Sequence, residues 1–208
     1  MTVTLRIPER AAAAVVSLGL VLLGACHDNP AKPIEGAGDP ENISRVTVAL
    51  TPVGGGTATQ SVVVDPDGTQ LPQPPGAPQG TLALSKGKTY NGTISLLNDL
   101  DSKNVIDISN EVKKEANFHR FFYTFTGTCQ TATTANNPSV PVSGMDVDTQ
   151  SPAQPVGLTF QLVVPSTAAT SSSCTMHVEL HHFETAKGDG TGSTFDTDLS
   201  LDFPATIS

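Results

Sequence analysis

Short runs of alternating apolar and polar residues, separated by glycine-rich and proline-rich turns, run through this chain of 208 residues. Such runs predict β-strands, because successive side chains of a strand point to opposite faces of a sheet. Only residues 110–118 carry a helical pattern, so the strand–helix rhythm of a parallel α/β fold is missing. We therefore expect a mainly β fold, an antiparallel Ig-like two-sheet β-sandwich of about eight strands with one short helix. The expected strands are residues 43–50, 61–64, 81–85, 89–98, 119–126, 157–164, 174–183 and 195–204.

The last two expected strands form the clearest pair. They flank the turn residues Lys187-Gly188-Asp189-Gly190, and their apolar positions predict a hairpin with one buried face. In the expected register His177 lies opposite Asp202, and His181 lies opposite Asp198, on the polar outer face. The apolar partners are then Met176 with Phe203, Val178 with Leu201, and Leu180 with Leu199.

Other elements are placed by the same patterns. The turn at Lys86-Gly87 predicts that residues 81–85 pair with residues 89–98. Residues 119–126 carry aromatic side chains on both faces, which predicts a central position between the sheets. In the helix we expect Ser109 as the N-cap, Glu111 in the first turn, and Val112 and Ala116 on one face.

The N-terminus predicts export and lipidation. Arg6 and Arg10 precede an uncharged apolar run, residues 11–23, which ends in the sequence Leu23-Gly24-Ala25-Cys26. This arrangement is typical of a signal peptide with a lipobox, and the run is shorter than the ~20 residues of a membrane-spanning helix. The alternative is a secreted protein with a chance cysteine. We expect residues 1–25 to be the signal peptide, residues 26–42 a lipidated flexible tether, and residues 43–208 the β-sandwich domain.

The expected location follows from Cys26 and the residue after it. Acyl chains on Cys26 would anchor the protein to the cell envelope. His27 stands where lipoproteins kept at the inner membrane of enteric bacteria carry aspartate, so we expect the outer membrane. Without residues 1–25 the chain has 9 basic and 19 acidic residues, which argues against a nucleic-acid partner.

Two cysteines remain in the expected domain. Cys129 and Cys174 would lie in an oxidising compartment, where a disulfide between them is expected. Each adjoins an expected strand, so neighbouring strands would bring them together. The alternative is a pair of buried free thiols.

Histidines and acids supply the candidate sites. Glu115 and His119 are spaced i, i+4 across the expected helix end. His182 is two residues after Leu180, so it lies on the apolar face of its strand. The three residues could therefore bind Zn²⁺ or Cu²⁺. The alternative is a structural hydrogen-bond cluster. His177, Glu179 and His181 share one strand face and could bind a metal loosely, but we expect this face to be solvated. The D-x-D spacings permit Ca²⁺ at Asp65 and Asp67 or at Asp146 and Asp148, although metal-free turns also carry such pairs.

The chain contains the segments D-P-D-G (65–68), T-Y-N-G-T-I-S-L-L-N (89–98), D-I-S-N-E-V-K-K-E-A-N-F-H-R-F-F-Y (107–123) and L-H-H (180–182). Together these segments resemble a family of small lipoproteins found chiefly in Bacteroidetes and similar bacteria, some of them loosely labelled as a type 1 periplasmic binding fold. The resemblance implies an envelope protein without an assigned activity. The label fits the strand pattern poorly, because that fold needs repeated βα units. The chain also differs in its proline-rich insert after Asp67, its two cysteines and His181, where arginine is usual.

The sequence lacks the motifs of several classes of enzyme. The chain carries no G-x-S-x-G, H-E-x-x-H, C-x-x-C or phosphate-binding glycine loop, so we expect no enzymatic activity. The leading hypothesis is a membrane-anchored, non-enzymatic β-sandwich that binds a ligand or an envelope protein partner. The alternative is a metal-binding (Zn or Cu) accessory lipoprotein for metal handling in the envelope.

Overall fold

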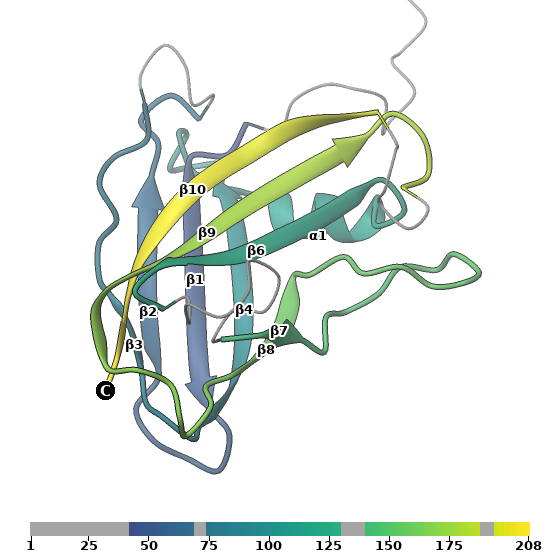
Figure 1. Cartoon of the computed structure of the whole chain (residues 1–208). Helices are drawn as coiled ribbons and strands as arrows, with labels where there is room; N and C mark the ends of the chain where they lie inside the picture. The colour runs from purple at the N-terminus through teal and green to yellow at the C-terminus, as the bar shows by residue number, and fades with distance from the viewer. Residues whose placement is uncertain (1–41, 69–73, 130–139, 188–193) are drawn as a thin grey trace, which may run out of the picture. The chain divides into compact units, whose positions relative to one another are not determined.

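Two β-sheets face each other across one hydrophobic core in the computed structural model, which describes residues 42–68, 74–129, 140–187 and 194–208 (Figure 1). This architecture confirms the predicted mainly β sandwich. The first sheet has the strand order β2-β1-β4-β8-β7, with β5 also paired to β4; the second has the order β3-β10-β9-β6. The first contains β1 (Arg45–Pro52), β2 (Thr59–Val64), β4 (Thr89–Asn98), β5 (Ile106–Asp107), β7 (Val142–Ser143) and β8 (Thr159–Val163). The second contains β3 (Leu82–Leu84), β6 (His119–Gly127), β9 (Ser171–Phe183) and β10 (Phe195–Ile207).

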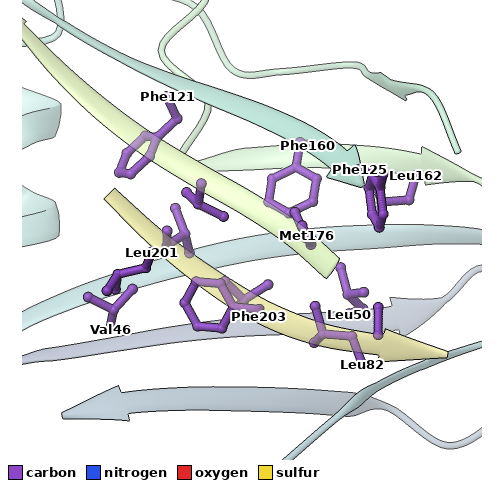
Figure 2. Close-up of a cluster of buried hydrophobic side chains, with 14 of the residues drawn as sticks. Val46, Leu50, Leu82, Phe121, Phe125, Phe160, Leu162, Met176, Leu201 and Phe203 are labelled. Atoms are coloured by element: carbon purple, nitrogen blue, oxygen red, sulfur yellow. The ribbon is translucent and has the colours of Figure 1, made fainter. Parts of the chain in front are cut away.

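The core is formed by the apolar faces that the alternation predicted. In β1, Val46, Val48 and Leu50 are buried, while their neighbours in sequence are more exposed. Figure 2 shows Leu50 from the first sheet near Phe203 from the second, with the ring of Phe160 also in the space between the sheets. Each of these side chains is at most 2% exposed, so the two sheets are held together by close packing of apolar groups.

The hairpin of β9 and β10 has the predicted register along most of its length. Leu180 pairs with Leu199, as expected, and so do the apolar pairs that follow toward the end of β10. The register shifts between Thr197 and Leu199, however, and His181 lies opposite Thr197. The predicted pairing of His181 with Asp198 is therefore wrong. Because a bulge adds one residue to a strand, it reverses the facing of the side chain there, and Asp198 is buried.

The pairing predicted for β3 is wrong as well. β3 does not form a hairpin with β4 but lies parallel to β10, so the second sheet is mixed. Both edges of β4 are occupied, since β1 and β8 pair with it on either side. After the turn at Gly87, which has a φ of 71°, the chain crosses from one sheet to the other. Leu82 and Leu84 are buried there against the shared core.

β6 is an edge strand and not the central one that its aromatic residues predicted. Among the described strands its only sheet neighbour is β9. Phe121 and Phe125 face the core, whereas Phe122 lies on the opposite face and packs against His181, with ring centroids 4.5 Å apart. Aromatic residues on both faces therefore reflect packing on the outer side of an edge strand.

The helix α1 (Ile108–Lys114) begins two residues earlier than predicted. Its N-cap is Asp107, whose carboxylate accepts a hydrogen bond from the backbone nitrogen of Asn110. Ser109 is not the cap, because its hydroxyl oxygen accepts a hydrogen bond from the backbone nitrogen of Leu96 at 2.7 Å. Glu111 lies in the first turn as expected. The helix ends before Ala116, and Val112 buries its side chain against the core.

Cys129 and Cys174 lie at disulfide-bonding distance, with Cα atoms 5.2 Å apart. Cys129 follows β6, and Cys174 lies in β9 opposite Gly127 of β6. Between the two cysteines the chain leaves the second sheet, contributes β7 and β8 to the first, and returns. The cysteine pair therefore joins the place where the chain leaves the second sheet to the place where it returns.

The predicted signal peptide, Cys26 and the tether up to residue 41 lie outside the described residues. Within the described ranges, no helix is long and apolar enough to cross a membrane.

Candidate functional site

The three predicted metal-ligating residues come together where α1 gives way to β6. His119 is the first residue of β6 and lies directly opposite His182 of β9 in the sheet. Glu115 is the C-cap of α1, one short loop before His119. One possible ligand atom from each of the three side chains lies within 4.8 Å of the other two. The structure therefore brings Glu115, His119 and His182 together, and the metal itself stays a prediction.

The two imidazoles are buried on the inner face of the sheet. The ring centroids of His119 and His182 are 4.3 Å apart, and the two residues are 0% and 5% exposed. Glu115 is half-buried. The cluster therefore has a closed side in the core and a carboxylate on the side nearer to solvent.

Asp198 is a fourth member that the sequence pattern did not predict. The bulge in β10 turns its carboxylate inward, where Oδ2 lies 3.8 Å from Nε2 of His119 and 3.9 Å from Nδ1 of His182. Strict alternation along residues 195–204 places this side chain on the outer face. The extra residue of the bulge turns the side chain of Asp198 to the inner face.

Burial sets the charge of His119. Burial, together with the neighbouring His182, lowers its pKa from 6.5 to about 4, so the imidazole is neutral near pH 7. Nδ1 lies 3.2 Å from the carbonyl oxygen of Glu115. A neutral ring in this position carries its proton on Nδ1 and donates it to that carbonyl. The Nε2 atom is then left with a lone pair, and it has no hydrogen-bond partner among the described residues.

Burial acts in the opposite direction on Asp198. It raises the pKa of the carboxyl group from 3.8 to about 6, while the positive charge that His182 can carry opposes this rise. A carboxylate at this position is hardly accessible to water, since the side chain is 2% exposed. The cluster thus combines a desolvated acid with an imidazole nitrogen that has a free lone pair.

A buried lysine supports the loop that carries Glu115 and His119. The ammonium group of Lys187 donates to the carbonyl oxygens of Ala116 and of His119, the latter at 2.9 Å. It also lies 3.0 Å from Oδ2 of Asp148, and both of these side chains are 0% exposed. The sequence pattern predicted that Lys187 lies in the turn of a hairpin. The rest of that predicted turn, residues 188–190, lies outside the described residues.

No family model, curated protein or solved structure matches this chain.

The other two predicted candidate groups have different surroundings. His177 pairs with Asp202 as predicted, with Nδ1 2.8 Å from the carboxylate, and it also contacts Glu179 at 3.3 Å. Partial burial lowers the pKa of His177, but the hydrogen bonds to Asp202 and Glu179 outweigh it, so the net pKa is raised. His181 contacts the same Glu179 at 3.3 Å. These side chains form an ion-pair row on the outer face.

The aspartates of the two D-x-D turns organise the backbone. Asp65 accepts hydrogen bonds from the backbone nitrogens of Asp67 and Gly68. Asp146 accepts from the backbone nitrogens of residues 157 and 159, and Asp148 accepts from those of residues 150 and 154. Calcium at either pair stays a prediction, and an ion there would have to compete with these hydrogen bonds.

Proposed function

We propose that this chain is a lipid-anchored protein of the bacterial envelope, on the outer membrane, whose β-sandwich domain binds a protein partner and catalyses no reaction. Cys26 after the apolar run supports the anchor. The surface formed by Arg120, Phe122, His181 and Phe195, which we call the aromatic face, supports the binding role and carries the proposal. This surface lies on the side of the second sheet that points away from the core.

The aromatic face is preformed by stacking of its own side chains. The rings of His181 and Phe195 are nearly parallel, with an interplanar angle of 9° and centroids 3.9 Å apart. The guanidinium carbon of Arg120 lies 4.8 Å above the centre of the Phe122 ring. Phe195 remains 42% exposed. Aromatic residues and arginine are enriched at protein–protein interfaces, and side chains held by packing lose little entropy on binding.

Cross-linking in intact cells tests the binding role. A photo-crosslinking amino acid in place of Phe195 should give a defined adduct with one envelope protein, which Phe122→Ser should abolish. The matched control is the same amino acid in place of Val53, which is 47% exposed in the turn after β1, a strand of the other sheet. Equal adducts from both positions, or none from position 195, would contradict the proposal.

Lipidation makes a separate prediction. Cys26→Ser should move the protein from the membrane fraction to the soluble fraction, because acyl chains supply the membrane affinity and one chain alone binds only marginally. Detergent-phase partitioning of wild type and variant measures the effect. A variant that still enters the detergent phase would show that the anchor is not on Cys26.

Metal handling in the envelope is a second candidate function. It is favoured by the gathering of Glu115, His119 and His182 at one buried place. Elemental analysis of the soluble Cys26→Ser protein, purified without chelators, tests it. A stoichiometric content of zinc or copper would support this function.

A further inference from the structure

We propose that Asp198 completes a buried site for a divalent ion of the Zn²⁺ class, in which His119, His182 and Asp198 are the ligands and Glu115 stands at the solvent side. This inference rests on the metal-handling function proposed as the second candidate, and it names the ligand set and the class of ion. Asp198 is the new element. It joins the site through the bulge in β10 and not through any sequence motif.

The backbone places the three donor groups before any ion arrives. His119 and His182 are fixed opposite each other by the pairing of β6 with β9, and the bulge fixes Asp198 beside them. Tetrahedral Zn²⁺ with bonds of about 2.0–2.1 Å needs donor atoms about 3.3–3.4 Å apart. Oδ2 of Asp198 lies 3.8 Å and 3.9 Å from the imidazole nitrogens. The two distances from the carboxylate to the imidazoles therefore exceed those of a tetrahedral zinc site by about half an ångström.

The orientation of His119 is that of a metal ligand. Ligated histidines donate their second ring N–H to a carbonyl or carboxylate, which fixes the tautomer and directs the lone pair at the ion. Nδ1 of His119 has this contact with the Glu115 carbonyl. Nε2 is fully buried, has no hydrogen-bond partner among the described residues, and faces Asp198. A bound cation would satisfy this lone pair.

The donor types select the class of ion. Two imidazole nitrogens and one carboxylate oxygen suit Zn²⁺ and Cu²⁺, while Ca²⁺ and Mg²⁺ prefer oxygen ligands throughout. The carboxylate of Asp198 compensates part of the ion's charge in a place where a lone negative charge is costly. Lys187 is held by Asp148 and by the carbonyl oxygens of Ala116 and His119.

Glu115 explains how an ion reaches a buried site. It is half-buried, and its carboxylate lies within 4.8 Å of possible ligand atoms of both histidines. An ion captured there can pass to the imidazoles, and Glu115 or a water then takes the open fourth position.

Zinc titration of the full-length Cys26→Ser chain, after removal of metal with a chelator, tests the site. The Cys26→Ser chain, with all its metal ligands unchanged, should bind one Zn²⁺, and this binding should raise its temperature of unfolding. Asp198→Asn keeps the shape of the side chain and should weaken binding by more than ~100-fold, since even groups that only orient a ligand contribute 10–100-fold. His182→Ala should abolish the zinc-dependent shift. Glu179→Gln, a carboxylate change on the outer face of β9, is the matched control and should leave zinc affinity unchanged.

The outcomes separate the two proposals. If the Cys26→Ser chain binds no Zn²⁺, both the metal-handling function and this site are wrong, and the histidines form a structural cluster. If that chain binds Zn²⁺ but Asp198→Asn binds it equally well, the metal-handling function stands and Asp198 is not a ligand. If the variants of the ligand residues fail to fold, a measurement on the Cys26→Ser chain alone still tests the site. Co²⁺ bound to the Cys26→Ser chain should give the intense visible absorption of a four-coordinate site, and the weak spectrum of an octahedral ion would overturn the assignment.

Discussion

Lys187→Met should lower the free energy of unfolding by about 3–5 kcal/mol, the usual cost of breaking a buried ion pair by removing one partner. The variant leaves the Asp148 carboxylate without its cation and the carbonyl oxygens of Ala116 and His119 without their donor. Burial lowers the pKa of Lys187, and its hydrogen bond to Asp148 opposes this, so the pair depends on both members. The expected loss is large because the methionine stem replaces the packing of lysine but none of its hydrogen bonds.

Urea unfolding followed by circular dichroism measures this loss. The matched control is Lys88→Met, which removes an exposed lysine and should change the free energy of unfolding by less than about 0.5 kcal/mol. Adding Asp148→Asn to Lys187→Met should restore part of the stability, because the second change removes the uncompensated charge. A Lys187→Met variant as stable as Lys88→Met would show that the buried pair contributes no net stability.

Reduction of the bond between Cys129 and Cys174 should cost about 3–4 kcal/mol on the chain-entropy model. The two residues are separated by 45 positions, and both are at most 3% exposed. The segment between them crosses to the first sheet and returns. Without the bond, the unfolded chain regains the freedom of this long loop, while the folded chain keeps the same sheets.

Thermal unfolding with and without reductant checks the expectation. The oxidised protein should unfold at a higher temperature than the reduced protein, and a Cys129→Ala/Cys174→Ala variant should be insensitive to reductant. Mass spectrometry of unreduced protein from cells gives an independent result. Two free thiols in that protein would contradict the bond.

The sequence predicts those parts of the fold that depend on local alternation. Val46, Val48 and Leu50 mark the buried face of β1 unambiguously, because every second residue is apolar. The strand pairing of β3 is not local. Leu82 and Leu84 show that the segment is buried on one side, but they carry no information about which of two sheets receives it. The choice depends on which edges of β4 are free, and distant segments decide that.

The candidate site, like the fold, could be predicted from the sequence only where local patterns place the residues. Spacing brought Glu115 and His119 into one hypothesis, and strand parity added His182. The inward position of Asp198 was not predicted, because a bulge shows in the sequence only as a break in the two-residue alternation. The polar residues 196–198 hide that break. The burial of Lys187 was not predicted for a different reason. A lysine next to glycine is typical of a turn, and only the carboxylate of Asp148, 39 positions earlier in the sequence, makes its burial stable.

The position of β10 has a consequence for when the domain can form. Residues 195–207 fill the middle of the second sheet, with β3 on one side and β9 on the other. Until this strand is present, β3 has no sheet partner among the described strands, and β9 is paired only with β6. A chain that enters an export channel from its N-terminus would therefore remain without a closed core until these residues have followed. If the chain is exported as we propose, this topology would delay folding to the far side of the membrane, where the cysteines can also be oxidised.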